Sequence, residues 1–559
     1  MTLRSPDSIR QLFLEKRGIL PETQDSFVDP NFFRDTYSPW LMKGMEAAVV
    51  RIIQAIEGKQ KITIFGDYDA DGVPATALLI RGFRRLGKEV EGIIPTRASG
   101  YGLTMEAVEV CKAKKIDLLI TVDNGTVAQA EVAALAEAGI DVIVCDHHQP
   151  QEGHLADQAL AILNPKQSDC QYPFKELCGC ALAWKLLLAL YERLEADGAQ
   201  LRWNLDLVAL SIIADMVPLV GENRVLARYG LMVLRKTRTL GLKALAEMAG
   251  VKLEDISAGS VSFRLAPRIN APSRMHKEAL SDGGNAALQL LITDDAAEAY
   301  RLAGFLQEQN TQRQGLLDQH LEEARLMAAD FKDRMAIVVY KAEWSTGVIG
   351  LMAGRLLEHY QRPVVVLAQE GGIIKGSARS VDGIDAVQMI TAADSLLERY
   401  GGHSKAAGLT FEQTESSEKT VDRFRTQIEE WLQGQGMGIE SMALAQGRAA
   451  DLEIFPEEIS LELAVKLQEL EPFGIGFPAP LFTMIAEVRG VRMVGAAQNH
   501  LSCMLVEGLT QKKAIAFNYN GPLIEEGKKY RLYFSINVEE WRQVESAVCQ
   551  VRRIEVLES

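Results

Sequence analysis

The stretch Lys61-Ile-Thr-Ile-Phe-Gly-Asp-Tyr-Asp-Ala-Asp-Gly72 decides how this chain folds around its chemistry. An apolar run of strand type, Ile62–Phe65, leads directly into Asp67, Asp69 and Asp71. Carboxylates this close repel one another, and the repulsion raises their pKa values unless a positive charge lies between them. A hard divalent cation, which prefers oxygen ligands, is the simplest such charge. The stretch therefore predicts a metal site at the end of a strand.

The composition is that of an ordinary globular protein. The 559 residues are 47% hydrophobic and 24% charged, and no apolar run approaches the roughly 20 residues of a membrane span. The length predicts about three or four domains. The N-terminus lacks an apolar export signal and the seven cysteines show no framework spacing, so we expect a cytoplasmic protein without membrane contact. The net charge of −15 does not favour a simple polyanion binder, although bound cations and local basic stretches can offset it.

The pattern along the chain predicts two α/β domains, a long helix between them and a C-terminal β-barrel. After an N-terminal extension over 1–50, expected strands at 62–65, 90–94, 118–122 and 142–145 alternate with helices near 73–86, 104–114 and 128–138. Such alternation indicates a parallel sheet, here in a domain over 51–293. An uninterrupted periodic run predicts the long helix over 294–334. A smaller α/β domain over 335–435, a linker over 433–447 and a barrel over 448–559 follow.

Polar groups gather where the expected parallel strands end. Asp123 follows the third strand, and Asp146, His147 and His148 follow the fourth. Ligands of open α/β sheets bind at the carboxyl ends of strands, so these side chains should converge with the three aspartates of the first strand. Asp215 ends a further apolar run, 207–214. A single aspartate after a strand can equally be a helix N-cap, but a whole edge of acids and imidazoles indicates two Mn²⁺ or Mg²⁺ ions about 3.5–4 Å apart.

These motifs together resemble the DHH phosphoesterase superfamily. Asp67-Tyr-Asp-Ala-Asp-Gly72, Val122-Asp-Asn-Gly125 and Asp146-His-His148 carry the resemblance. Three further segments, 267–271, Glu343-Trp344 through Gly347-Val-Ile-Gly350, and Gly401-Gly-His403, are similar to the superfamily's single-strand-specific exonucleases. The resemblance implies a parallel-sheet DHH domain, a DHHA1-type domain, an OB-like barrel and 5′-to-3′ degradation of single-stranded DNA to 5′-mononucleotides, through two-metal hydrolysis with Mn²⁺ or Mg²⁺, in recombination and repair.

The resemblance also implies roles for individual residues. The metal ligands would be Asp69, Asp71, Asp123, His147 and Asp215, with Asp67 close by. Asp123 would bridge the ions, His148 would bond a substrate phosphate, and Asp146 would orient the site from behind.

Two further groups of residues would hold the DNA. Arg268, Asn270 and Arg274 lie on what we expect to be a polar loop and would clamp the scissile phosphate, although surface arginines in ordinary ion pairs are an alternative. Arg268 would thereby also take part in catalysis. In the second domain the resemblance implies contacts from Ser377, Arg379, Ser380, Gly402 and His403.

The expected barrel carries four aromatic residues that could contact DNA. Phe477, Phe517, Tyr519 and Trp541 are candidates for stacking on bases, with barrel core as the alternative for each. Rival activities are hydrolysis of short oligonucleotides or cyclic dinucleotides, and a non-catalytic single-strand-binding scaffold in replication. We expect a monomer, and the resemblance further implies that it works with single-stranded-DNA-binding protein and a helicase.

Overall fold

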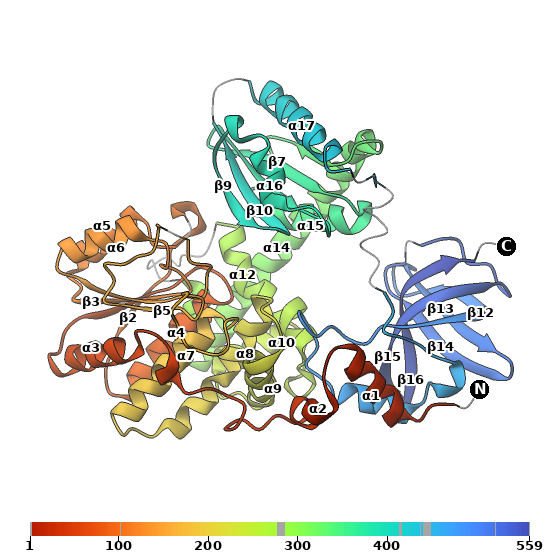
Figure 1. Cartoon of the computed structure of the whole chain (residues 1–559), viewed down its shortest axis with the longest axis horizontal. Coiled ribbons are helices and arrows are strands. Elements are labelled where there is room, and N and C mark those ends of the chain that lie inside the picture. Colours follow the sequence, from red (N-terminus) through yellow and green to blue (C-terminus); the bar gives the residue numbers. More distant parts are fainter. Residues whose placement is uncertain are drawn as a thin grey trace.

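The computed structural model describes residues 3–100, 102–151, 153–276, 285–412, 416–436, 438–439, 449–519 and 521–557. It consists of a large α/β domain, a smaller α/β domain and a β-barrel (Figure 1). The long helix α14 (Ala296–Ala328) runs from the large domain to the small one, which lies at the top of Figure 1. The barrel lies at the right of the same view, and the sheet of the large domain lies at the left. The fold class predicted from the sequence is therefore confirmed.

The large domain is built on a five-stranded parallel sheet. The strand order is β2-β1-β3-β4-β5, and every neighbouring pair is parallel. The central strands are buried on both faces because helices cover the sheet on each side, which is why they read as continuous apolar runs. The strands are β1 (Ile62–Phe65), β2 (Glu91–Ile93), β3 (Leu118–Val122), β4 (Asp141–Cys145) and β5 (Ala161–Leu163).

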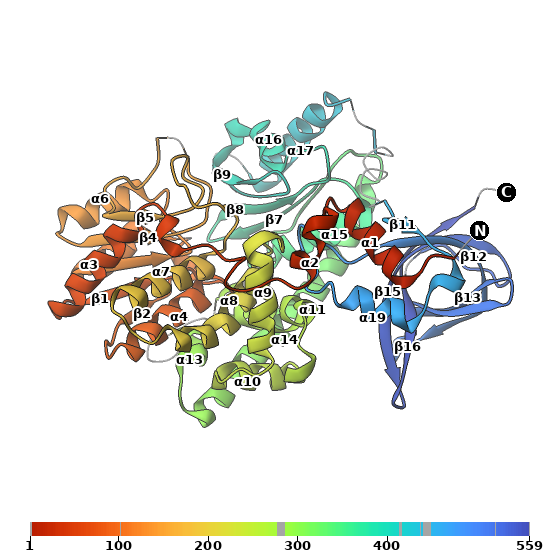
Figure 2. The same ribbon diagram turned by 60° about the horizontal axis from the view of Figure 1, so that its bottom comes forward.

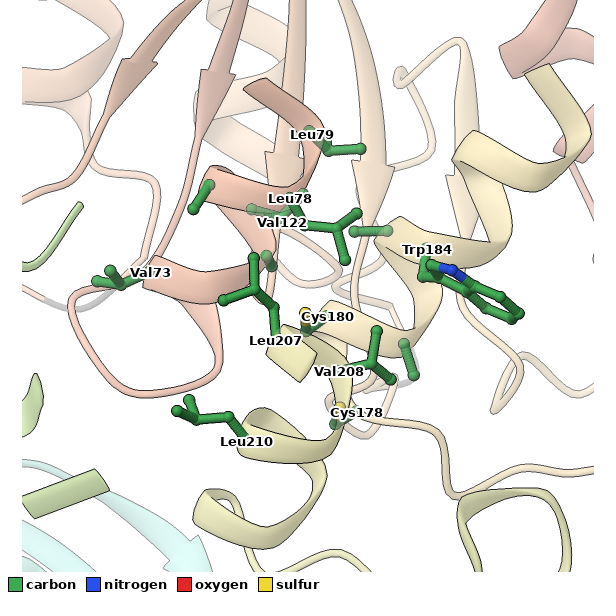
Figure 3. Packing of buried hydrophobic residues seen from close by; sticks show 14 of the residues in the cluster. Val73, Leu78, Leu79, Val122, Cys178, Cys180, Trp184, Leu207, Val208 and Leu210 are labelled. Carbon is green, nitrogen blue, oxygen red and sulfur yellow. The ribbon is translucent and has the colours of Figure 1, made fainter. Parts of the chain in front are cut away.

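Helices of the large domain cover the sheet and extend into an all-helical half. In the buried core between the sheet and these helices, Val122 lies beside Leu78 and Leu207 lies beside Cys180 (Figure 3). The helices are α3 (Met45–Glu57), α4 (Gly72–Arg85), α5 (Met105–Lys114), α6 (Gln129–Glu137), α7 (Gly179–Arg193), α8 (Leu205–Ala214), α9 (Gly221–Leu234), α10 (Leu240–Met248), α11 (Ala258–Ser260), α12 (Ala266–Arg274) and α13 (Ala286–Ile292). A π-helical turn, Val261–Leu265, joins α11 to α12.

The small α/β domain has a mixed sheet. Its strand order is β6-β7-β8-β10-β9, in which only β6 and β7 are parallel. The hairpin of β9 (Leu397–His403) and β10 (Ala406–Phe411) was not predicted, because its glycine-rich exposed strand lacks an apolar alternation. The other elements are β6 (Ile337–Tyr340), α15 (Ile349–Tyr360), β7 (Val364–Glu370), β8 (Ile373–Arg379), α16 (Ala386–Thr391) and α17 (Ser417–Gln433).

The C-terminal domain is a closed barrel. Strands follow the order β12-β13-β14-β16-β15, and β15 pairs back onto β12. All barrel pairs are antiparallel except β14 with β16, which is the arrangement of an OB-fold. The elements are β11 (Leu452–Glu453), α19 (Leu461–Gln468), β12 (Phe482–Val494), β13 (His500–Glu507), β14 (Thr510–Ala516), β15 (Lys529–Trp541) and β16 (Val544–Val556). The linker predicted before the barrel lies mostly outside the described residues.

The N-terminal extension packs on the barrel before it reaches the large domain (Figure 2). Helix α1 (Pro6–Lys16) buries Ile9 and Phe13 in the barrel core, and α2 (Pro21–Val28) follows it. From α9, Arg224 donates to the carbonyl oxygens of Phe27, Leu470 and Pro472 at 3.0, 2.7 and 3.1 Å. This arginine therefore ties the extension and the barrel to the large α/β domain.

Candidate metal centre and cationic cleft

Acidic and imidazole side chains from three adjacent strands converge at one edge of the parallel sheet, as the sequence predicted. Asp67 follows β1, Asp123 follows β3 and His147 follows β4, and all three are buried. Their donor atoms fall into three overlapping groups, Asp67–Asp69–Asp123, Asp71–His147–Asp215 and Asp123–His147–His148, each with donor atoms within 4.8 Å of one another. Because Asp123 and His147 each belong to two groups, the cluster is one continuous site. Its geometry supports the proposed ligand set.

The N-terminus of α7 supports the cluster from below. Asp71 accepts main-chain hydrogen bonds from Gly179 at 2.6 Å and from Cys180 at 2.9 Å. A Cβ added at Gly179 would lie 2.7 Å from the Cβ of Asp123, so only glycine allows the helix to come this close. The helix dipole favours negative charge at this end. The helix therefore orients Asp71, whose two oxygens each keep a second lone pair for a cation.

His147 lies at the centre of the cluster. Its Nε2 is 3.1 Å from Asp123, 3.6 Å from Asp215 and 3.7 Å from Asp71. Burial and the neighbouring His148 charge lower its pKa to about 3. The ring is therefore neutral at physiological pH, which is the form that binds a metal.

The carboxylates repel one another and resist ionisation in the metal-free protein. Burial, followed by the charges of neighbouring aspartates, raises the pKa of Asp71 to about 6 and that of Asp215 to about 8. The same causes raise the pKa of Asp123 well above its ordinary value. Burial and then the charge of Asp69 raise the pKa of Asp67. Such a set is stable as anions only when positive charge is supplied.

Asp67 provides an independent test that a cation fits. Its side chain is buried, yet among the described residues neither carboxylate oxygen accepts a hydrogen bond of good geometry. The main-chain N–H of Tyr68 is near enough only to offset part of the rise in the pKa of Asp67 that burial causes. Buried carboxylate oxygens without donors are costly unless a cation satisfies them. The donor set of carboxylate oxygens with one neutral imidazole is that of Mn²⁺ or Mg²⁺. We therefore include Asp67 among the proposed ligands with Asp69, Asp71, Asp123, His147 and Asp215.

Asp146 and His148 form a pair behind the ligands. Asp146 accepts from the main-chain N–H of Thr126 and His147 at 2.9 and 2.8 Å, and its Oδ1 lies 2.7 Å from Nδ1 of His148. Burial alone would lower the pKa of His148, but the hydrogen bond and charge of Asp146 outweigh it and raise the pKa to about 9. Asn164, which sequence reasoning missed, donates to the carbonyl of His148 at 2.8 Å. The pair therefore presents a protonated imidazole beside the metal ligands.

Metal addition should stabilise the protein, and more so near pH 8 than near pH 5. The pKa values of Asp71 and Asp215, about 6 and about 8, exceed their ordinary value of 3.8. In that window the metal-free folded state binds more protons than the unfolded state, so rising pH lowers its free energy of unfolding. A cation at 100 times its Kd adds about 2.7 kcal/mol, or roughly 5–10 °C for a domain of 150–250 residues. Calorimetry with EDTA or Mn²⁺ at both pH values measures this, and an equal shift at both would contradict it.

A cationic cleft of about 780 Å³ lies between the two α/β domains. Among the residues that the structure describes, five basic side chains line it against one acid, Glu370, which is paired with Lys375 at 2.7 Å. Burial, then the charges of Arg97, Arg313 and Arg379, lowers the pKa of Arg274 to about 10, while Asp69 acts in the opposite direction. Arg274 therefore lies between the metal cluster and the second domain. The five basic residues are Arg97, Arg274, Lys375, Arg379 and Arg399.

The structure brings some of the proposed DNA contacts into this cleft and leaves others outside its lining. Ser377 and Arg379 line it, and Ser377 accepts from Nη1 of Arg379 at 2.9 Å. Ser380 is buried and is not part of the lining. Gly402 and His403 lie on the exposed strand β9, and His403 is close enough to contribute to the lowered pKa of His147. Arg97, which sequence reasoning missed, enters from the loop after β2, and its guanidinium lies 5.0 Å from the ring centroid of Tyr68.

The segment of Arg268, Asn270 and Arg274 is a helix, α12, and the prediction of a polar loop was wrong. Its two prolines suggested a loop, but Pro267 stands in the first turn and Pro272 is tolerated inside the helix, where Ile269 and Ala271 pack in the core. Arg268 donates to Gln307 of α14 at 2.7 Å and does not line the cleft. Asn270 has a buried side-chain oxygen without a donor among the described residues.

Comparisons with known proteins agree with this architecture. Family models match three segments: the DHH family N-terminal domain at 61–212, the DHHA1 domain at 333–434 and the RecJ OB domain at 450–553. A Haemophilus influenzae single-stranded-DNA-specific exonuclease RecJ is 34% identical, over 96% of this chain and 94% of the relative. The Bacillus subtilis RecJ is 36% identical over 91% of this chain, which spans 63% of that longer relative.

A solved structure extends the likeness to three dimensions. The crystal structure of RecJ from Thermus thermophilus in complex with Mn²⁺ matches with a TM-score of 0.82 at 32% identity, covering 98% of this chain and 76% of that one. A Mg²⁺ complex of the same protein also matches.

The fold and the site define a metal-dependent phosphoesterase of the DHH class, with a DHHA1 domain and an OB-fold attached. Acid and imidazole side chains that could hold metal ions at the sheet edge, together with a cationic cleft, are what hydrolysis of a phosphodiester requires. The chain belongs to the RecJ family of single-stranded-DNA-specific exonucleases.

Proposed function

We propose that this chain removes 5′-mononucleotides one after another from the 5′ end of single-stranded DNA. The observation that carries the proposal is the position of Arg274, which lines the cleft together with Arg379 of the small domain and is near enough to Asp69 of the metal cluster for the two charges to interact. A terminal 5′-phosphate carries more negative charge than an internal phosphodiester, so clustered guanidinium groups select it. A phosphate held there would place the next phosphodiester toward the carboxylates.

The residues of the chain divide the work between binding and proton handling. When bound, two divalent cations supply Lewis acidity and lower the pKa of a water molecule at the site. Arg274 and Arg379 hold the terminal phosphate and so fix the position of the reacting bond. His148, whose Nδ1 is bonded to Asp146, keeps a proton on Nε2 that it can donate to a phosphate oxygen. Asp146 thereby positions this proton without touching substrate.

The dimensions of the cleft favour a strand end over a duplex. A volume of about 780 Å³ is within the range of roughly 300–1,000 Å³ that holds one small molecule, such as a single nucleotide. Beyond it, the barrel supplies a surface for the rest of the strand. Phe517 is 51% exposed and remains a candidate for stacking, whereas Phe477 is 2% exposed and belongs to the core. Tyr519 is half-buried, and the side chain of Trp541 is outside the described residues.

The wider setting is proposed from the family resemblance. It comprises DNA recombination and repair in the cytoplasm, a monomeric enzyme, and partnership with single-stranded-DNA-binding protein and a helicase. Among the described residues, no helix is both long enough and apolar enough to cross a bilayer.

Digestion of end-labelled strands tests the proposed function. With Mn²⁺, a single strand labelled at its 5′-phosphate should release labelled mononucleotide from the first turnover, and a strand labelled at its 3′ end should release label last. Removing the 5′-phosphate should raise KM, and so should Arg379→Ala on a phosphorylated strand. A charge-assisted hydrogen bond contributes about 1.5–3 kcal/mol, so the loss in kcat/KM should be roughly 10–100-fold.

Three outcomes would contradict the proposal. Label released first from the 3′ end would reverse the polarity. Cleavage confined to dinucleotides or cyclic dinucleotides would support a small-substrate phosphodiesterase. A strand that is bound but remains at full length would support a replication scaffold.

A further inference from the structure

The segment from Glu343 to Gly350 contains a motif that the proposed function leaves unexplained. It forms the turn between β6 and α15, and Gly347 and Gly350 line the cleft where the small domain meets the large one. Neither glycine has a side chain that could bind metal or donate a hydrogen bond. Their role must therefore come from the close approach of other atoms that the missing side chain allows.

Gly347 allows the main chains of the two domains to touch. A Cβ added at this position would lie 1.9 Å from the carbonyl oxygen of Arg274 and 2.8 Å from its carbonyl carbon. In the other direction, Nη1 of Arg274 donates to the carbonyl oxygen of Gly347 at 3.4 Å. Only a hydrogen atom fits between α12 of the large domain and this turn of the small domain.

Both sides of this contact are held firmly. Trp344 is 2% exposed, and its Nε1 donates to Glu323 of α14 at 2.8 Å. The main-chain N–H of Ser345 donates to Nε2 of His320, also on α14, at 3.4 Å. On the other side, Arg274 ends α12, whose apolar residues are packed in the core of the large domain. Because neither main chain can yield easily, the contact fixes the distance between the domains.

Gly350 makes room for side chains of its own domain. A Cβ there would lie 3.2 Å from Nη2 of Arg379 and 3.2 Å from the hydroxyl of Ser377. The absence of a side chain thus makes room for the phosphate-binding arginine against the first turn of α15. Gly347 therefore affects the spacing of the two domains, whereas Gly350 affects the position of the arginine that we propose binds phosphate.

We propose that Gly347 is a specificity-determining position for this enzyme. Its contact with the carbonyl of Arg274 sets the spacing of the two α/β domains and hence the width of the cleft that admits a single strand and excludes a duplex end. The inference rests on the proposed nuclease function and names the contact that selects its substrate.

Gly347→Ala tests the proposal directly. The added methyl must move the two main chains apart by about 1 Å or more, because carbon and oxygen do not pack as closely as this site would require. The rate of degradation of a blunt duplex, relative to that of a single strand, should rise roughly tenfold or more. The value of kcat/KM on single strands should fall by up to about 100-fold, because moving the reacting phosphate by 1 Å from the metal centre can cost that much. Mn²⁺-dependent hydrolysis of bis(p-nitrophenyl) phosphate, which needs only the metal centre, should be unchanged.

Two variants of the same helix serve as controls. Gly354→Ala places a methyl where nothing lies within 4 Å and should behave as the unmodified protein. Gly350→Ala should raise KM for a phosphorylated strand and leave the ratio of duplex to single-strand rates unchanged. An unaltered ratio in folded Gly347→Ala would overturn the proposal.

The anchor on α14 offers a second route if Gly347→Ala does not fold. His320→Ala removes the acceptor for Ser345 and should raise the duplex ratio in the same direction, whereas His320→Gln keeps an acceptor and should restore the ratio. An unaltered ratio in His320→Ala would likewise overturn the proposal. Failure of the unmodified protein to degrade single strands would instead reject the proposed function, and the inference with it.

Discussion

Asp123→Asn should abolish exonuclease activity and at the same time make the metal-free protein more stable. Asp123 contributes to two of the three donor groups, so its loss affects both proposed metal positions. Loss of residues behind a ligand alone costs about 10–100-fold in metal affinity or activity, so loss of this ligand should cost roughly 1000-fold or more. The neutral amide also removes repulsion from Asp71, Asp69 and Asp215, which raises the free energy of unfolding in EDTA.

Strand digestion and thermal melting together measure this prediction. The melting temperature in EDTA should rise, and the further rise on adding Mn²⁺ should shrink. Asp157→Asn, at an exposed aspartate of the same domain, is the matched control and should change neither quantity. Retained activity in Asp123→Asn would remove Asp123 from the proposed ligand set.

Arg224→Leu should uncouple the barrel from the large α/β domain. Arg224 is 2% exposed, and its guanidinium lies 4.0 Å from the ring centroid of Phe27. The guanidinium donates to one carbonyl group of the extension and to two of the segment that leads into the barrel. Burial without a carboxylate among these partners lowers its pKa to about 9. Leucine leaves the carbonyls without a donor, at about 1–3 kcal/mol for each one that stays buried. This loss of free energy should destabilise the interface between the large domain and the barrel with its N-terminal extension.

Calorimetry and limited proteolysis can follow the uncoupling. Arg224→Leu should split the melting into an earlier transition of the barrel and extension and a later transition of the two α/β domains. The rate of degradation of long strands should fall more than the rate of hydrolysis of bis(p-nitrophenyl) phosphate. Arg228 lies one helical turn away and contacts the same segment from a partly exposed position, through longer hydrogen bonds to the carbonyls of Glu469 and Glu471 at 3.2 and 3.4 Å. Arg228→Leu should therefore shift the barrel transition in the same direction but cost less than about 1 kcal/mol. A single unshifted transition in Arg224→Leu would contradict the prediction.

Local patterns carried much of the fold and of the metal site. Strands β1 and β3 were predicted at their observed bounds, because a strand buried on both faces is a continuous apolar run. The proposed ligands follow strands β1, β3 and β4 or end α8, and parallel topology brings those ends together. Short or atypical elements escaped prediction. Strand β5 has three residues, the exposed β9 has no alternation, and the prolines of α12 hid a helix that core packing stabilises.

The sequence by itself determined the class of chemistry, since adjacent aspartates after a buried strand predict a divalent metal whatever surrounds them. Only the tertiary structure decided what faces that metal. Arg97 reaches the cleft from a loop with no motif, Arg224 finds its carbonyl partners at least 197 residues away, and Gly347 meets Arg274 across two domains. Electrostatic repulsion between neighbours in the chain is local and can be read from spacing. Contacts between distant segments depend on how whole domains pack, which no local pattern records.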